Sequence, residues 1–259
     1  MNFEQLTISI EPRTPWQALD LGVQVAKHWY VSLLWLWLSF ALPINAALIL
    51  LLGLDSIYTY ILIWWFKPLY EQPLLYYISR AVFSEPITVT DTLKAMPRYL
   101  RSHLWTYLTW ARLSSSRILG SAVTVLEGLT RSRQRQRLSA LKSRKNHLLS
   151  LMVVCIHVEF FLFAALIIFL FSIIPTELYK PTWDYAATLI ANQAWPYWYE
   201  LFTTITTVLF MMLIAPFFVC CSFTAYLNTR VNLEAWDIEQ AFRTTARRLQ
   251  AQTAIPVST

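Results

Sequence analysis

Five ionisable residues stand within otherwise apolar stretches of the chain, where charged side chains most often carry function. They are Lys67, Glu71, Arg80, His157 and Glu159. Ionisable groups inside a membrane span are energetically costly, so they mark an ion or proton path or pair with one another. Two interpretations follow: a relay that moves an ion or proton, and an internal strut that fixes how helices pack. One lysine and two carboxylates make a short relay, which favours the strut.

The depth of these residues in a bilayer predicts which of them can meet. At about 1.5 Å of helix per residue, Lys67 lies about 15 Å below the outer boundary, Glu71 about 21 Å and Arg80 about 35 Å. On the following span, Glu159 lies about 24 Å below the same boundary. Helical side chains lean toward the N-terminus of their own helix. We therefore expect a Lys67–Glu71 pair within one helix and an Arg80–Glu159 pair between helices.

The sequence offers no support for metal, hydrolase or phosphate-loop chemistry. His157 and Glu159 are two residues apart and do not share a helix face, and the chain has only four histidines. No GxSxG elbow occurs. The four glycines are too widely spaced for a Walker loop, a Rossmann fingerprint or a GxxxG motif, and the three cysteines form no CxxC. We expect no catalytic residue, no metal and no cofactor, and a protein that is not an enzyme.

Two charged segments are candidate docking surfaces. The basic run RSRQRQRLSALKSRKNH at 131–147 either binds anionic lipid of the cytoplasmic leaflet or an acidic partner, or fixes topology before the next span. Nucleic acid is not expected, because no supporting fold is evident. In 228–250, acidic residues precede basic ones, which suits a helix dipole or a partner surface. The residues are Arg131, Arg133, Arg135, Arg137, Lys142, Arg144, Lys145, Arg230, Glu234, Trp236, Asp237, Glu239 and Arg243.

The composition places these residues in a bilayer. Hydrophobic residues make up 56% of the 259 residues and charged residues 14%, whereas a soluble domain carries about 25% charged residues. Aromatic residues make up 15%, which excludes a disordered chain. Four stretches, 29–54, 57–83, 148–174 and 201–227, are long and apolar enough to cross a core about 30 Å thick. The predicted fold is all-α: a polytopic membrane protein with four transmembrane helices and amphipathic interfacial or cytoplasmic helices.

The basic residues orient these spans. Of 21 Lys and Arg, 12 lie within 84–147 and one lies within 175–200. Cytoplasmic loops carry the excess of Lys and Arg, so we expect 84–147 and both termini in the cytoplasm and 175–200 outside. The predicted regions are a cytoplasmic segment with an interfacial helix (1–28), two spans (29–83), a basic helical region (84–147), two further spans (148–227) and a C-terminal helix and tail (228–259).

Two helices are expected along the membrane surface. Thr14-Pro15-Trp16-Gln17 is a capping box with proline at the first helical position, which predicts a short helix to Lys27. Across 92–113, apolar residues recur at helical spacing with basic residues off that stripe. This pattern is typical of an amphipathic helix on an anionic leaflet, although a packed cytoplasmic hairpin fits it too. Pro216 is expected to kink the fourth span.

The segment YLNTRVNLEAWDIEQAFR at 226–243 resembles a signature of an uncharacterised family of bacterial inner-membrane proteins. It is similar, more distantly, to membrane domains of glycerophosphodiester phosphodiesterases. The uncharacterised family fits further stretches better, namely LTISIEPRTPWQALDLG, WWFKPLYEQPLLYYISRAVF, RLSSSR, VLEGL and VCIHVE. Longer members carry a further domain of unknown function, shared with transglutaminase-like membrane proteins. This chain stops at Thr259 without that domain, so we expect a split member or the anchor half.

The genes of that family stand beside a MoxR-type AAA ATPase and von Willebrand A-like proteins, which implies an assembly or envelope role. The sequence and the resemblance predict a non-enzymatic multipass inner-membrane anchor or assembly subunit of a bacterial envelope complex. It would dock cytoplasmic partners, among them a MoxR-type ATPase, through 84–147 and 228–250. One alternative is a transport or lipid-handling module that uses Lys67, Glu71 and Glu159. A weaker alternative is the membrane domain of a lipid-processing enzyme whose catalytic chain is separate.

Overall fold

The chain folds entirely into helices over the part that the computed structural model describes. That part comprises residues 11–53, 57–85, 87–109, 117–127, 131–142, 148–173 and 197–234, with 184–185, 187–188, 191, 242 and 245. No strand occurs in these residues, which confirms the predicted all-α class. The helices are α1 (Pro15–Leu52), α2 (Ile57–Trp65), α3 (Lys67–Ala81), α4 (Val89–Leu108), α5 (Arg117–Glu127), α6 (Arg131–Lys142), α7 (Leu148–Ile173) and α9 (Tyr197–Glu234).

Helix α1 starts at the predicted capping box but runs much further than predicted. The Thr14 hydroxyl accepts a hydrogen bond from the Gln17 backbone N–H at 3.3 Å, and Gln17 Oε1 accepts one from the Thr14 N–H at 3.0 Å. The expected end at Lys27 is wrong: no glycine or proline occurs from Lys27 to Leu42, and α1 continues through Pro43 to Leu52. The helix ends at Gly53, whose φ of 83° is readily adopted by glycine.

The second predicted span is divided into two helices by a turn at Phe66. Pro68 lacks a backbone N–H, and its ring crowds the carbonyl four residues earlier, so a continuous helix is disfavoured there. The chain turns at Phe66 (φ −79°, ψ 0°), and α3 starts at Lys67 with proline in its first turn. Three helices, α1, α7 and α9, are therefore long and apolar enough to cross a membrane by themselves.

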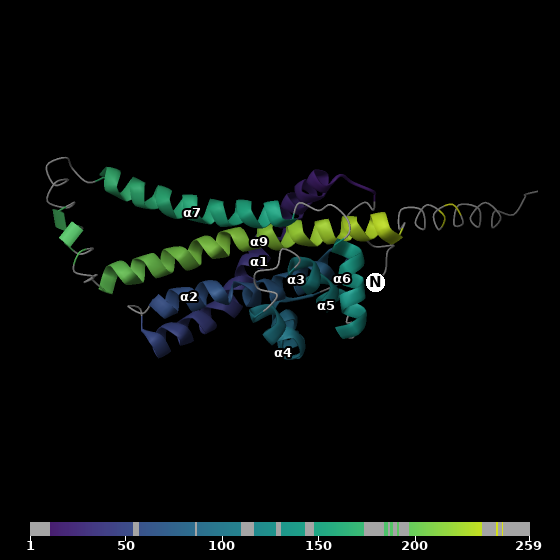
Figure 1. The fold of residues 1–259 in the computed structure, drawn as a ribbon, viewed down its shortest axis with the longest axis horizontal. Helices are drawn as coiled ribbons and strands as arrows, with labels where there is room; N and C mark the ends of the chain where they lie inside the picture. The colour runs from purple at the N-terminus through teal and green to yellow at the C-terminus, as the bar shows by residue number, and fades with distance from the viewer. Residues whose placement is uncertain are drawn as a thin grey trace, which may run out of the picture.

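Helices α1 and α9 form the centre of the fold and run antiparallel (Figure 1). They approach so closely at Gly22 that a Cβ there would lie 2.3 Å from the Cα of Cys221. Four residues earlier on α1, the carbonyl of Ala18 accepts a hydrogen bond from the Thr224 hydroxyl at 2.7 Å. Only glycine permits this backbone approach, since any side chain at residue 22 would force the helices apart.

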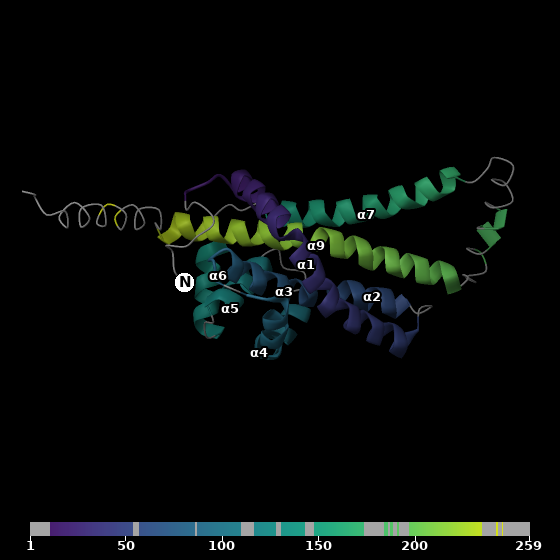
Figure 2. The same ribbon diagram turned by 180° about the vertical axis from the view of Figure 1, so that it is seen from behind.

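The short helices α3 to α6 gather at one end of α1 and α9, as both views show (Figures 1 and 2). Helix α3 is buried on most of its surface, between α1, α4, α5 and α9. At the start of α4, Met96 of the predicted stripe is buried, Leu93 is half-buried and Lys94 is exposed. Because α4 packs against α3, this part of the stripe faces protein. The remainder of 92–113 includes residues 110–113, which lie outside the described part.

Helix α7 is the least enclosed of the long helices. It packs mainly against α9 and diverges from it toward its Ile173 end (Figure 1). Cys155 of α7 is buried against Phe218 of α9, whereas Phe160 and Ile168 are 65% and 68% exposed. So much exposed apolar surface suits a helix that contacts lipid.

Candidate functional site

An ion pair joins α3 to α7 inside the apolar part of the fold. Lys67 Nζ donates a hydrogen bond to Glu159 Oε1, and the two side chains are only 9% and 13% exposed. Lys67 is the first residue of α3, so its side chain points back toward α2 and away from the later turns of its own helix. This direction brings the ammonium group to α7 and explains why Lys67 pairs between helices.

The predicted pairing of the intramembrane charges is therefore wrong. Arg80 does not meet Glu159: its guanidinium pairs with Glu85 Oε2 at 2.5 Å, and these side chains are 44% and 38% exposed. The cause is local, because α3 ends at Ala81 and the turn through Ser84, at φ 54°, folds Glu85 back over the helix end. Lys67 accordingly takes Glu159 as its partner in place of the expected Glu71.

Glu71 and His157, which the sequence analysis grouped with Lys67 and Glu159, lie in surroundings that differ from each other. Glu71 lies one turn along α3, is only 7% exposed and is close enough to Glu159 for the two carboxylates to repel each other. His157 is exposed on α7, with Nδ1 2.7 Å from the carbonyl of Val153 and its ring beside Phe161. The structure thus gathers Lys67, Glu71 and Glu159 and leaves His157 outside.

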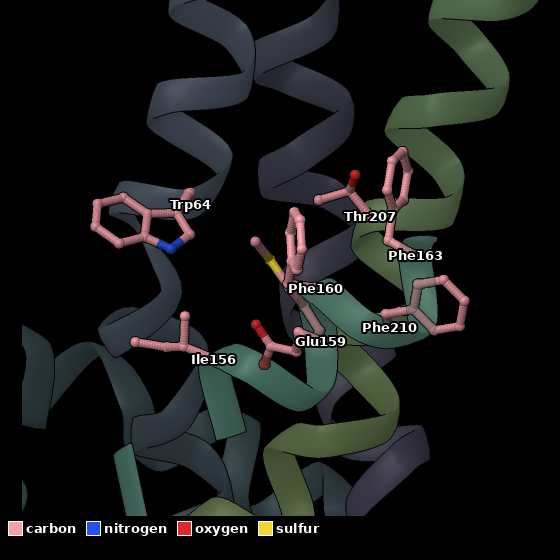
Figure 3. A pocket seen from close by; sticks show the side chains of 8 residues that line it. Trp64, Ile156, Glu159, Phe160, Phe163, Thr207 and Phe210 are labelled. Atoms are coloured by element: carbon pink, nitrogen blue, oxygen red, sulfur yellow. The ribbon is translucent and has the colours of Figure 1, made fainter. Parts of the chain in front are cut away.

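Glu159 also lines a cavity of about 270 Å³ between α2, α7 and α9 (Figure 3). Its carboxylate points into the space that Trp64 of α2 and Phe160 of α7 border (Figure 3). The walls are mostly aromatic and aliphatic. Besides Glu159, the polar groups of the lining are the indole N–H of Trp64 and the hydroxyl of Thr207, which donates to the Thr203 carbonyl at 2.8 Å. The complete lining is Trp64, Ile156, Glu159, Phe160, Phe163, Thr207, Phe210 and Met211. Sequence reasoning missed this cavity, because no local pattern indicates where three helices leave a gap.

A second charged cluster lies where α5, α6 and α9 meet. Arg137 pairs with Glu127 at 3.1 Å and with Glu234, and Arg230 pairs with Glu234 at 2.8 Å and with Glu127 at 3.7 Å. The Tyr226 hydroxyl donates to Glu127 Oε1 at 2.6 Å. Two arginines and two glutamates balance in charge, so three of the predicted docking residues bind one another within the molecule. Sequence analysis did not identify Glu127 and Tyr226 as members of such a cluster.

The other predicted docking residues are placed only in part. Arg133 is exposed on α6, and Arg131, Arg135 and Lys142 belong to the same helix. Docking through them stays a prediction. Arg144, Lys145, Trp236, Asp237, Glu239 and Arg243 lie outside the described residues. Within the described part, no group of three or more His, Cys, Asp or Glu side chains is placed to hold a metal ion.

Fold and site together define the class: an all-helical protein with three helices long and apolar enough to cross a membrane. An ion pair of zero net charge joins α3 to α7, and a small, mostly apolar cavity lies between α2, α7 and α9. No family model, curated protein or solved structure matches the chain.

Proposed function

We propose that the chain is a non-enzymatic multipass anchor or assembly subunit of a bacterial envelope complex. The observation that carries this proposal is the Lys67–Glu159 ion pair, because both side chains are nearly buried. A relay needs charges that line water and exchange partners, whereas a strut needs them paired and withdrawn from water. Leaving one member of a buried pair without its partner costs about 3–5 kcal/mol. That cost suits a fixed connection between α3 and α7 better than a path that opens in every transport cycle.

The proposed topology has four crossings of a bacterial inner membrane, with both termini in the cytoplasm. Helices α2 and α3 together make the second crossing: from Ile57 to Ala81 they extend about 37 Å, more than the core of about 30 Å. Two features support this: α2 and α3 return alongside α1, and the basic residues gather in 84–147. In this topology α4, α5 and α6 lie on the cytoplasmic side.

Cysteine labelling tests this topology directly. The three native cysteines are buried, so single cysteines at exposed positions give a clear signal. We expect Tyr185→Cys to react with an impermeant maleimide in intact cells, and Lys94→Cys to react only after the inner membrane is opened. Both residues are exposed, so accessibility of the side chain is matched. Labelling of Lys94→Cys in intact cells would refute the proposed orientation.

The proposed docking surface is the exposed part of the basic run. Arg137, Arg230 and Glu234 already neutralise one another with Glu127, so we assign docking to the remaining basic residues, of which Arg133 is exposed. Its partners are the anionic cytoplasmic leaflet and a cytoplasmic protein, which the family resemblance suggests is a MoxR-type ATPase. Each basic residue near an anionic surface contributes about 1 kcal/mol.

A pull-down from native membranes in mild detergent, followed by mass spectrometry, tests the anchor role. We expect stoichiometric recovery of an ATPase or another envelope protein with the native chain and less with Arg133→Glu. Lys94→Glu is the matched control, because it makes the same charge change at an exposed site outside the basic run. Recovery of the chain alone, together with a specific solute, would instead favour the transport alternative.

A lipid-handling role is the second candidate, and the cavity beside Glu159 is the observation that favours it. It is compatible with the ion pair, since a lipid site needs no movement of charge. The weaker alternative, a membrane domain for a separate lipid-processing chain, predicts that the pull-down recovers such an enzyme.

A further inference from the structure

The cavity between α2, α7 and α9 has the dimensions and walls of a site for one hydrocarbon chain. Its volume is about 270 Å³, just below the range of about 300–1,000 Å³ for small-molecule sites. It therefore admits a single chain and excludes a bulky headgroup. Phe160 and Ile156, both on its lining, are 65% and 41% exposed, so the cavity opens on the apolar outer side of α7. In a bilayer this opening faces lipid.

We propose that this cavity binds a long-chain alcohol, an uncharged membrane lipid with a hydroxyl group on a hydrocarbon chain. The inference depends on the proposed crossing of the membrane by α7 and α9, but it does not depend on partner docking. Three features select this ligand. They are the charge balance of the polar floor, which is the Glu159 carboxylate paired with Lys67, the capacity of Glu159 to accept a further hydrogen bond, and the depth of Glu159 in the membrane.

The charge balance of the floor selects an uncharged ligand. Glu159 is the charged residue of the lining, and Lys67 neutralises it. A cationic ligand would compete with Lys67 for the carboxylate, and an anionic ligand would be repelled by that carboxylate. A neutral ligand leaves the pair intact.

The hydrogen-bonding capacity of Glu159 selects a donor. Within the described residues, Lys67 Nζ is the donor to this carboxylate, through Oε1. An ionised carboxylate accepts about four hydrogen bonds, so Oε2 can accept another from a ligand. The carboxylate points into the cavity (Figure 3), where a hydroxyl group would meet it. Because a carboxylate donates nothing, a ligand ending in a carbonyl would gain no bond from Glu159.

The depth of Glu159 excludes phospholipid headgroups. Glu159 lies near the middle of α7, about 17 Å from Leu148 and about 21 Å from Ile173. Whether depth is counted along α7 or from the outer boundary, where it is about 24 Å, Glu159 lies inside the apolar core of about 30 Å. Moving an ion to that depth costs tens of kcal/mol in the limiting case, whereas a hydroxyl costs only a few and recovers part by hydrogen bonding. An alcohol can therefore bring its polar group to Glu159, and a phospholipid cannot.

Photolabelling of the full chain in detergent micelles tests the proposal. The probe is octadecanol with a diazirine in its chain, and the comparison probe has the same chain ending in a sulfate. We expect the alcohol to label cavity peptides containing Phe160, Phe163 or Phe210 at least about fivefold more than the sulfate does. One net hydrogen bond alone gives about fivefold, and the charge of the sulfate weakens its binding further. Ile156→Trp places an indole in the cavity opening and should abolish this difference.

Val154→Trp is the matched control, because Val154 is 57% exposed on the same helix but does not line the cavity. Labelling by the alcohol should persist in this variant. Equal labelling by the two probes, or equal labelling of Ile156→Trp and Val154→Trp, would overturn the proposal. Because the experiment uses micelles and a single protein, its failure would leave the anchor role and the topology to their own tests.

Discussion

Replacing Lys67 with methionine removes one partner of the ion pair and leaves Glu159 beside an apolar cavity. The Glu159 side chain is 13% exposed, so water replaces little of the lost attraction. Removing one partner of a buried pair costs about 3–5 kcal/mol. The isolated carboxyl can take up a proton instead, which limits the cost to about 4 kcal/mol at pH 7. We therefore expect Lys67→Met to lower the free energy of unfolding by about 3–4 kcal/mol.

The double variant Lys67→Met/Glu159→Met separates the ion pair from simple packing. It replaces both charges with apolar side chains of similar length, a change that is often neutral or stabilising in a buried site. We expect it to recover most of the stability that Lys67→Met loses. Arg80→Met is the matched control, because it breaks a pair whose side chains are 44% and 38% exposed. An exposed pair contributes less than about 1 kcal/mol.

Thermal unfolding in detergent, followed by circular dichroism, measures these differences. For a chain of this size, each kcal/mol shifts the Tm by about 2–4 °C. Lys67→Met should therefore melt about 6–16 °C lower, and the double variant and Arg80→Met within about 4 °C of the native chain. Equal shifts for Lys67→Met and Arg80→Met would refute a buried pair. A double variant that melts as low as Lys67→Met would show that packing, and not charge, accounts for the loss.

Three further predictions concern other parts of the fold. Gly22→Ala should lower stability by about 3 kcal/mol, because its Cβ would lie 2.3 Å from Cys221 Cα; an unchanged Tm would contradict that close approach. Glu127→Gln should release α6 from α5 and α9, seen as faster amide exchange in 131–142, because the two arginines of the cluster lose a shared carboxylate. The Thr88 hydroxyl and then its backbone N–H lower the pKa of Asp91. This carboxylate therefore stabilises the start of α4 above its unfolded pKa, and the effect is lost as the pH falls through the lowered value. Asp91→Asn should remove that acid dependence from amide exchange in α4, and an unaltered pH profile would contradict the assignment.

Local sequence signals predicted the helices well where the physical cause is itself local. The capping box at Thr14 and the apolar stretches of α1, α7 and α9 depend on neighbouring residues, and the structure has each of them. The break at Phe66 could also have been predicted from the sequence, because Pro68 disfavours a continuous helix there. The apolar character of the segment suggested one continuous helix instead. The prediction that the first helix ends at Lys27 was wrong, because the chain becomes more apolar after Lys27 but its helical backbone continues.

The pairing of charges was not predictable by the same route. Counting residues gives depth along a helix, but it gives neither the rotation of the helix nor its tilt against its neighbours. Depth combined with the lean of helical side chains favoured Arg80 as the partner of Glu159, whereas the turn at Phe66 places Lys67 there. The cluster around Glu127 shows the same limit, because its members come from α5, α6 and α9.

The ion pair has a consequence for α7 that apolar packing cannot supply. In a bilayer, apolar side chains gain little by leaving lipid for another helix, so close packing and polar contacts decide how helices associate. Helix α7 packs mainly on α9, through a small contact at Cys155 and Phe218. Glu159 adds the one ion pair that the described part of α7 makes, and Lys67 thereby fixes which face of α7 turns inward. The same carboxylate forms the floor of the cavity. Loss of Lys67 should therefore free the rotation of α7 and disrupt the proposed alcohol site along with the strut.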